Sequence, residues 1–290
     1  MAEPVLGIIG GSGLYHMPDL HAVESIELST PFGAPSSPIT IGSLNGVDVA
    51  FLARHGHGHT LLPSEVPYRA NVYAMKTLGV KQILSVSAVG SLREEYAPLD
   101  VVIPDQIYDR TRGRTSTFFG NGFVAHIGFA QPFCPALSGT VHQCASESPA
   151  RAHKGGTLAV MEGPAFSTVA ESETYRKLGF SIIGMTALPE AKLAREAELC
   201  YCTMAMVTDY DVWHQTHESV TQEMVASNVH RNTEVAHGII RTLVSRLGVI
   251  APCECGDALA AALLTSFDLV PEATLQALEP IVGRYRTTRS

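Results

Sequence analysis

Two aspartates, Asp209 and Asp211, directly follow an apolar stretch that begins near Tyr201. The stretch has the composition of a buried strand, and polar residues bound it. Open α/β sheets bind ligands at the carboxyl ends of their strands, so both acids would point into that crevice. A carboxylate there accepts a hydrogen bond from an amine, and a protonated carboxyl donates one to a ring nitrogen. The alternative is that the pair caps the next helix or faces solvent.

Small or polar residues also follow other predicted strands. The first strand, at 5–9, leads into Gly10-Gly11-Ser12-Gly13, where backbone N–H groups and one hydroxyl could cradle an anion. The segment is not a dinucleotide fingerprint, because His16 stands where a third glycine is needed, and no Gly-Lys-Ser/Thr follows as in a P-loop. A structural tight turn explains it equally well.

Arg54 and His55 come after the predicted strand at 47–52, and Ser87 with Ala88 after that at 82–86. The guanidinium of an arginine presents a planar fork of donors that matches phosphate, so Arg54 is a candidate phosphate clamp. The hydroxyls of Ser87 and Thr186 could surround the same phosphate, although either alone is more often a cap or turn residue. Phe166, beside the turn at 162–164, could stack on a planar base or be an ordinary core residue.

Two groups of residues raise the question of a metal. His55, His57 and His59 alternate with glycines, with no carboxylate or cysteine beside them. The pairs Cys200/Cys202 and Cys253/Cys255 leave one residue between ligands, where zinc motifs usually leave two or more, so we expect no metal. For the first pair we expect core packing. The second lies in a turn and could form a local disulfide or pair elsewhere in the chain.

Strands and helices alternate along the chain, which predicts an α/β fold with a mostly parallel sheet. Further strands are expected at 101–103, 156–161, 182–185 and up to 209. Helices are expected at 70–78, 169–177, 190–198, 219–247, 258–267 and 271–278. Glycine and proline breaks are spread evenly over the 290 residues, so we expect one domain (1–290), with 251–290 a helical C-terminal extension.

Composition narrows the class of protein. Hydrophobic residues make up 46% of the chain and charged residues 17%, as in a compact enzyme. The net charge of −8 argues against electrostatic binding to nucleic acid or to an anionic membrane. No signal peptide or membrane-length apolar stretch is apparent, so we expect a cytoplasmic protein.

A set of short motifs occurs in order along the chain. They are Gly-Ile-Ile-Gly-Gly-Ser-Gly (7–13), Thr-Pro-Phe-Gly-x-Pro-Ser (30–36), Ala-Arg-His-Gly (53–56), Pro-Tyr-Arg-Ala-Asn (67–71), Ala-Val-Gly-Ser-Leu (88–92), Asp-Arg-Thr (109–111), Glu-Gly-Pro-x-Phe-Ser (162–167), Met-Thr-x-x-Pro-Glu (185–190) and Thr-Asp-Tyr-Asp (208–211). Together they resemble the methylthioadenosine phosphorylases of the trimeric purine nucleoside phosphorylase family. The match covers about residues 5–245, and the tail with Cys253 and Cys255 is similar to the C-terminal extension of some members.

This resemblance implies a single-domain three-layer sandwich and phosphate-dependent cleavage of 5′-methylthioadenosine to adenine and 5-methylthioribose 1-phosphate, in purine and methionine salvage. Inorganic phosphate is a co-substrate, and no cofactor is implied. The partners are small molecules, and the assembly is a homotrimer or a hexamer of paired trimers. The implied phosphate site comprises Ser12, Arg54, His55, Ser87, Ala88 and Thr186. The implied nucleoside site comprises His126, Phe166, Ser167, Met185, Asp209, Asp211 and Val220, with Asp209 at N7 and Asp211 at the 6-amino group as catalytic residues.

Relatives that cleave 6-oxopurine nucleosides carry asparagine in place of Asp209 and glutamate in place of Ser167. An ionised aspartate accepts from a 6-amino group but repels a 6-oxo oxygen, so the chain favours adenine. Ala165 and Val169 replace arginines that methylthioadenosine phosphorylases usually carry. Two alternatives stay open: a phosphorylase of 6-oxopurine nucleosides or methylthioinosine, and a nucleoside-binding protein without turnover.

Overall fold

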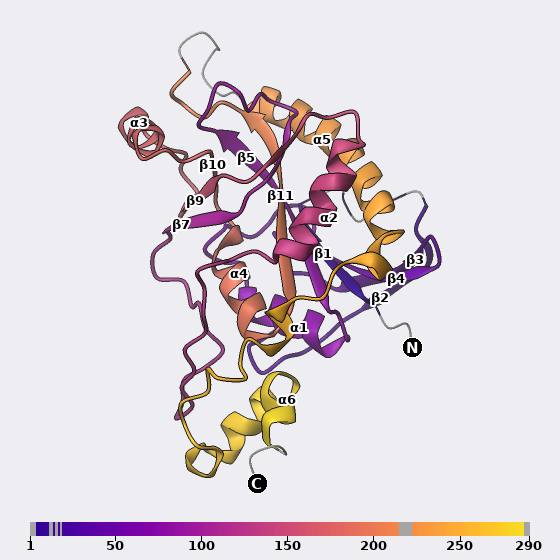
Figure 1. The fold of residues 1–290 in the computed structure, drawn as a ribbon, viewed down its shortest axis with the longest axis vertical. Helices are drawn as coiled ribbons and strands as arrows, with labels where there is room; N and C mark the ends of the chain where they lie inside the picture. Colours follow the sequence, from indigo (N-terminus) through magenta and orange to yellow (C-terminus); the bar gives the residue numbers. More distant parts are fainter. Residues whose placement is uncertain (1–3, 12–13, 15–16, 18, 215–221, 287–290) are drawn as a thin grey trace.

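The computed structural model describes residues 4–11, 14, 17, 19–214 and 222–286. In this part of the chain, eleven strands form one sheet with helices on both faces (Figure 1). The strands are β1 (Leu6–Gly10), β2 (His21–Ile26), β3 (Ile39–Leu44), β4 (Val47–Ala53), β5 (Gln82–Ser91), β6 (Val101–Ile103), β7 (Gln106–Arg110), β8 (Ala152–Lys154), β9 (Thr157–Met161), β10 (Ile182–Gly184) and β11 (Cys200–Asp209). The α-helices are α1 (Tyr68–Thr77), α2 (Pro135–Ser146), α3 (Val169–Lys177), α4 (Ala187–Glu196), α5 (Gln222–Val244) and α6 (Glu272–Arg286).

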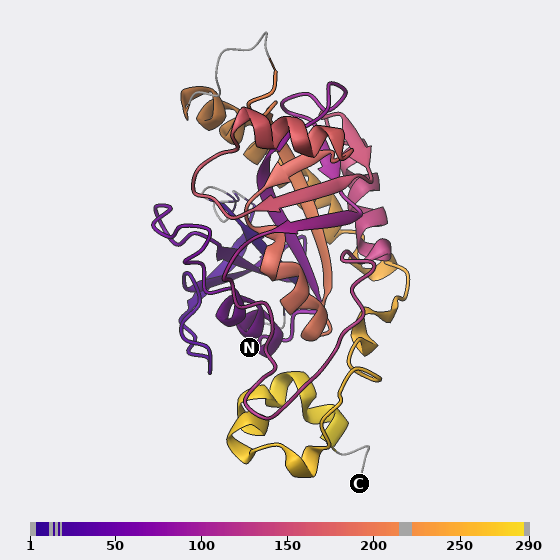
Figure 2. The ribbon, with the colours of Figure 1, turned by 90° about the vertical axis from the view of Figure 1, so that its left-hand side faces the viewer.

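The sheet is mixed and mostly parallel, as predicted. β1 runs parallel to β4 on one side and to β5 on the other, and β11 runs parallel to β5 along the opposite edge of β5. Antiparallel pairing is confined to the β2–β3–β4 meander and to the pairs β5–β10 and β6–β11. β5 and β11 therefore form the centre of the fold (Figures 1 and 2).

Helices α2 and α5 cover one face of β11, and α4 with α1 covers the other, which makes three layers. Successive side chains of β11 enter the two cores in turn, Tyr201 on the α1/α4 side and Cys202 on the α2/α5 side. Because both faces are buried, the strand is a continuous apolar run and does not alternate with polar residues.

Several predicted boundaries agree with the structure. β6 and α3 have the expected limits, and α3 begins with a capping box in which Thr168 and Glu171 bond each other's backbone N–H groups. β5, in contrast, continues to Ser91 where we expected its end at Val86. Ser87 and Ala88 consequently lie within a strand. The strands β2, β3, β7 and β8 and the helix α2 were not predicted.

The C-terminal extension corrects one helix. The predicted helix at 258–267 is absent, and residues 258–262 form turns after a short 3-10 helix, Glu254–Asp257. The alanine-rich segment favours a helix by composition, but its backbone pairs with a distant segment. The Leu264 N–H donates to the Val124 carbonyl (2.9 Å), and the His126 N–H donates to the Ala262 carbonyl (2.9 Å). Tertiary pairing here outweighs local propensity. The helix expected at 271–278 does form, as the longer α6.

None of the helices in the described part of the chain has the length and apolar character needed to cross a bilayer.

Candidate active site

Strand β5 changes its neighbour part-way along one edge. β1 pairs with β5 from Gln82 to Ser85, and β10 pairs with Gly90 and Ser91. Within the described residues, 86–89 pair with no strand on that edge, although β11 pairs with the other edge as far as Gly90. Neighbouring strands that part in this way open a crevice at the sheet, where α/β folds bind ligands. Several of the predicted site residues that the structure describes lie beside residues 86–90 of β5.

Two hydroxyls face each other near the start of the stretch of β5 at 86–89. The Ser87 Oγ and Thr186 Oγ1 atoms lie 3.4 Å apart. Thr186 precedes α4 at the N-cap position but makes no side-chain capping bond, so its hydroxyl is directed elsewhere. The helix-cap explanation for Thr186 is therefore wrong. Ala88 is the next residue of β5, and Ser12, predicted for the same end, lies outside the described residues.

Arg54 is buried beneath these hydroxyls and is only 2% exposed. Its Nε donates to Glu190 Oε2 (3.0 Å) and its Nη2 to Glu190 Oε1 (3.2 Å), while other N–H groups reach the carbonyls of Ile9 and Val86 and the Ser85 hydroxyl. Burial alone would lower the pKa of Arg54, but the Glu190 carboxylate outweighs it and the pKa is raised. The guanidinium edge that we expected to clamp phosphate thus holds Glu190, and at most one Nη1 hydrogen is left for an anion.

Glu190 was not among the predicted site residues, although the motif at 185–190 contains it. Its carboxylate is fully buried and also accepts a hydrogen bond from the Tyr201 hydroxyl (2.9 Å). The pattern of the sequence gives no sign of this pairing, because Arg54 and Glu190 are 136 residues apart.

His55 is held as a neutral ring with one available acceptor. Burial, and then the charge of Arg54, lower its pKa to about 4. Its Nδ1 lies 2.9 Å from the Leu61 carbonyl, an oxygen that can only accept, so Nδ1 carries the proton and Nε2 is an acceptor. The ring stacks on that of His59, with the ring centroids 4.3 Å apart.

The two aspartates lie beside Gly90, just beyond the stretch of β5 at 86–89. Asp209 pairs with Gly90 across the β5–β11 ladder, three residues along β5 from Ser87, or about 10 Å. A Cβ at Gly90 would lie 3.1 Å from Asp209 Oδ1 and 3.3 Å from the Asp211 Cβ, so the missing side chain makes room for both acids.

The two carboxyls differ in their hydrogen bonds. Asp209 accepts from the Thr208 hydroxyl (2.7 Å) and from the Asp211 N–H (2.8 Å), so both its oxygens are engaged. Asp211 Oδ2 is buried without a partner among the described residues. Burial raises the pKa of both carboxyls, and the neighbouring Asp209 charge also raises that of Asp211. An acid with a raised pKa retains a proton that it can donate.

The segment from the end of β11 to Trp213, which carries the two aspartates, is anchored from both sides. Asn228 and Asn232 of α5 donate to the carbonyls of Thr208 (2.8 Å) and Val207 (3.0 Å). Trp213 donates its indole N–H to the Ser91 carbonyl (2.7 Å), and its ring lies under the Arg176 guanidinium at 3.4 Å. These contacts fix the segment against the last residues of β5 and β11.

Arg114 fixes the backbone around Met185, a role that the sequence did not reveal. Its Nη1 donates to the carbonyls of Met185 (2.7 Å) and Leu188 (2.8 Å), and its Nε bonds both oxygens of Glu162 (3.1 Å). Its side chain is 3% exposed. Although Ala165 and Val169 replace two arginines expected near this turn, Glu162 still has a charged partner.

Comparison with known proteins identifies this arrangement. The family model described as Phosphorylase superfamily matches residues 5–245. The chain belongs to the phosphorylase superfamily. A relative in Gloeobacter violaceus named S-methyl-5′-thioadenosine phosphorylase is 56% identical, covering 98% of this chain and 97% of that protein. One in Chloroflexus aurantiacus with the same name is also 56% identical, covering 98% and 99%.

Solved structures agree. A methylthioadenosine phosphorylase sourced from an Antarctic soil metagenomic library superposes with a TM-score of 0.93 at 47% identity, covering 97% of this chain and 99% of that one. Methylthioadenosine phosphorylase from Schistosoma mansoni in complex with adenine superposes with a TM-score of 0.83 at 35% identity, covering 89% and 96%. The predicted fold of this superfamily is therefore confirmed for the chain.

In this phosphorylase, Phe166 is 63% exposed, so the alternative that it is a core residue is wrong. Ser167 is buried, and its hydroxyl lies near Asp211. Burial is the main cause of the raised pKa of the Asp211 carboxyl, and the Ser167 hydroxyl lowers that pKa in part. Ser167 thus belongs to the aspartate end of the crevice, whereas Phe166 projects from the protein next to it.

Within one chain of the phosphorylase, His126 lies away from the other predicted site residues that the structure describes. It is exposed, and its backbone pairs with the C-terminal extension. The extension and the end of β11 lie at opposite ends of the molecule in both views (Figures 1 and 2). Val220 lies outside the described residues.

The cysteines correct two expectations. Cys200, expected in the core, is only half-buried, and the structure has Cys253 and Cys255, for which a local disulfide and a pairing elsewhere stayed open, as free thiols. The thiols of these three residues meet that of Cys134, and each sulfur lies within 4.8 Å of the others. Cys202 is buried on the α2/α5 side, as expected. The spacing along the sequence argued against a metal site, but the four donors come from three separate segments that spacing cannot relate.

Proposed function

We propose that this protein cleaves 5′-methylthioadenosine with inorganic phosphate to give adenine and 5-methylthioribose 1-phosphate. One observation carries the proposal: Ser87 of β5 faces the Thr186 hydroxyl, and about 10 Å further along the same strand Gly90 lies against Asp209 and Asp211. Hydroxyls and a neutral histidine suit a phosphate, and acids of raised pKa suit a purine. The names of the relatives, at 56% identity, support the same substrate.

At the phosphate end, we assign Ser12, Ser87, Thr186, the backbone of Ala88, His55 and Arg54. The hydroxyls donate to phosphate oxygens. His55 Nε2 is an acceptor, so it would bind the O–H of a monoprotonated phosphate. Arg54 contributes positive charge from beneath the site and one Nη1 hydrogen. The cradle positions the nucleophile against the sugar and neutralises part of its charge.

At the purine end, we assign the base to Asp209, Asp211, Ser167 and Phe166, the ribose to Met185, and the 5′ group to His126 and Val220. A phosphate oxygen bonds the anomeric carbon as the bond to purine N9 breaks, and the electron pair moves into the purine. Asp209 gives its proton to N7, so adenine leaves as a neutral molecule. The ionised Asp209 then regains a proton from solvent. Asp211 accepts from the 6-amino group. No organic cofactor enters these steps.

We further propose a homotrimer. His126 is exposed and far from Asp209 within one chain, so a neighbouring subunit is the source from which it would reach a 5′ substituent. Large apolar side chains exposed near each place, Val124 and Leu264 by the extension and Phe166 and Val169 by the crevice, are consistent with subunit contacts. Native mass spectrometry would count the chains and distinguish a trimer from a hexamer.

The reaction would serve purine and methionine salvage in the cytoplasm.

The deciding experiment is an assay of the purified protein with methylthioadenosine, adenosine, methylthioinosine and inosine, each with and without phosphate. We expect the highest kcat/KM for methylthioadenosine and no base release without phosphate. Preference for inosine would favour a 6-oxopurine phosphorylase. Tight binding of methylthioadenosine without any turnover would favour a nucleoside-binding protein.

A further inference from the structure

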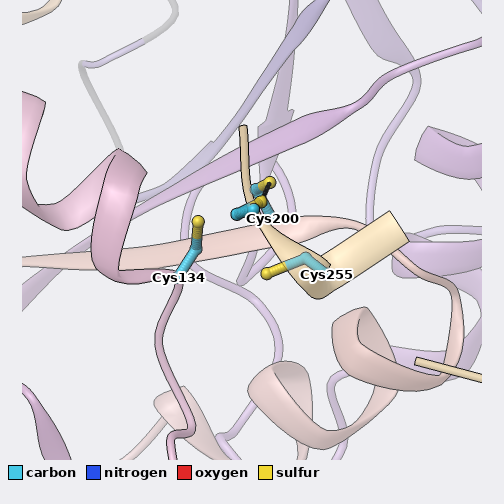
Figure 3. Close-up of side chains that lie close together, drawn as sticks. Cys134, Cys200 and Cys255 are labelled. Atoms are coloured by element: carbon cyan, nitrogen blue, oxygen red, sulfur yellow. Dashed lines mark hydrogen bonds between the residues drawn. The ribbon is translucent and has the colours of Figure 1, made fainter. Parts of the chain in front are cut away.

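Four cysteine thiols form a cluster away from the crevice. Cys134 lies at the N-cap of α2, Cys200 is the first residue of β11, and Cys253 and Cys255 flank Glu254 in the C-terminal extension. Figure 3 shows Cys134, Cys200 and Cys255 directing their sulfurs toward a common region. All four Sγ atoms lie within 4.8 Å of one another, and those of Cys200 and Cys253 are 3.3 Å apart.

These distances fit a tetrahedral metal site. Zinc binds thiolate sulfur at about 2.3 Å, so the sulfurs of a tetrahedral Zn(Cys)₄ centre lie about 3.8 Å from one another. The observed cluster needs only small side-chain adjustments to reach that spacing. The ligand set contains sulfur alone, and soft sulfur ligands in tetrahedral geometry select zinc over magnesium or calcium. Four protein ligands leave no open position, as in structural zinc sites.

The surroundings of the cluster suit a metal thiolate. Cys134 and Cys255 are 0% and 3% exposed, whereas Cys253 is exposed, so a metal can enter from one side. The Leu137 N–H of α2 donates to Cys134 Sγ (3.5 Å). Such an N–H···S bond offsets part of the negative charge of four thiolates.

Two of the three ligand-bearing segments are already fixed by the sheet. The Cys134 N–H donates to the Tyr201 carbonyl (2.8 Å), and the Cys200 N–H donates to the Lys81 carbonyl (3.0 Å). The third segment carries Cys253 and Cys255 and lies near the start of the C-terminal extension, where residues 250–253 have no helix or strand. A metal would therefore join the start of the C-terminal extension to the central strand β11 and to α2.

We propose that Cys134, Cys200, Cys253 and Cys255 bind one Zn²⁺ ion that fastens the C-terminal extension to β11 and α2. The site is structural. Cys200 and Asp209 lie at opposite ends of a ten-residue strand, roughly 30 Å apart, so the metal takes no part in phosphorolysis. The proposal stands independently of the substrate.

Metal content of the full chain, purified without affinity tags or chelators, tests the proposal. We expect one zinc ion per chain by inductively coupled plasma mass spectrometry. Replacement by Co²⁺ should give the visible bands of tetrahedral cobalt and the thiolate-to-cobalt charge-transfer band. The variants Cys253→Ser and Cys255→Ser should lose at least tenfold in zinc affinity. The matched control Cys144→Ser, a buried cysteine outside the cluster, should keep the metal.

Thiol accessibility provides a second test that needs no variant. In the zinc form, the four cluster thiols should resist alkylation until a chelator is added, and all six cysteines should react after denaturation without reductant. Fewer than six reactive thiols after denaturation, with no metal, would mean that disulfides occupy the cluster and would overturn the proposal. Zinc retained equally by both serine variants would also overturn it, since the metal would then lie elsewhere.

Discussion

Arg54 and Glu190 form a buried bidentate ion pair beneath the candidate phosphate site, with Nε–Oε2 and Nη2–Oε1 distances of 3.0 and 3.2 Å. Side-chain exposure is 2% for Arg54 and 0% for Glu190. A pair of this kind stabilises the fold in addition to any part it takes in ligand binding, because burying either charge alone would cost much free energy.

Arg54→Ala should therefore lose stability together with phosphate affinity. Removing one member of a buried pair typically costs about 3–5 kcal/mol, because the other charge is left uncompensated. Urea unfolding should show this loss, and the KM for phosphate should rise more than that for the nucleoside. Arg241→Ala, which breaks an exposed pair with Asp19, is the control and should cost less than about 1 kcal/mol. Equal costs for the two variants would contradict a stabilising role of the buried pair.

His55 should make stability depend on pH. Its pKa is about 4 in the fold and about 6.5 in an unfolded chain, so the folded state binds fewer protons between these values. Its contribution is fully present above pH ~6.5 and is lost as the pH falls toward 4. Chemical denaturation from pH 7 to 4 should show a shallower decline for His55→Asn. An NMR titration midpoint of the His55 ring near pH 6.5 would refute the assignment.

Asp209→Asn should change both base preference and pH dependence. The amide can donate to a 6-oxo oxygen but cannot supply the proton at N7, so kcat/KM for methylthioadenosine should fall by at least about 100-fold, within the range of general acid catalysis. Because burial raises the pKa of Asp209, activity of the unaltered protein should decline as the pH rises through that pKa. The variant should lack this decline. Unchanged selectivity between inosine and adenosine would mean that the base binds elsewhere.

Gly90→Ala tests whether β5 forms the floor under the acids. The added methyl group would lie 3.1 Å from Asp209 Oδ1, closer than most real contacts, and would displace one carboxylate. We expect a drop in kcat/KM of about tenfold or more, equivalent to about 1.4 kcal/mol of transition-state stabilisation. Gly238→Ala, at a helical glycine with no atom within 4 Å of the new Cβ, is the matched control. Full activity of Gly90→Ala would place the substrate away from this strand.

Arg114→Met should weaken nucleoside binding without affecting phosphate. The change removes charged hydrogen bonds to the Met185 carbonyl and to Glu162, each worth about 1.5–3 kcal/mol. Part of that loss should appear as a raised KM for methylthioadenosine in steady-state kinetics. If phosphate KM rises equally, Arg114 supports the whole crevice and not the ribose side alone.

The sequence predicted elements whose signals are local. The apolar run before Asp209 predicted β11, and the helical pattern at 169–177 predicted α3. Contacts between distant segments could not be predicted in this way. The Arg54–Glu190 pair spans 136 residues, and the thiol cluster joins three segments. The helix expected at 258–267 failed for the same reason, because pairing with the segment around His126 outweighs its composition.

The stretch of β5 between Ser87 and Gly90 also limits how the site can vary. Ser87 and Gly90 belong to one extended segment, so backbone pitch alone sets the spacing between phosphate and base. A one-residue insertion or deletion between them would turn every later side chain of the strand to the other face. This part of β5 therefore fixes the distance between the phosphate site and the base site. Substrate range can change through the side chains and loops that surround it, but not through its length.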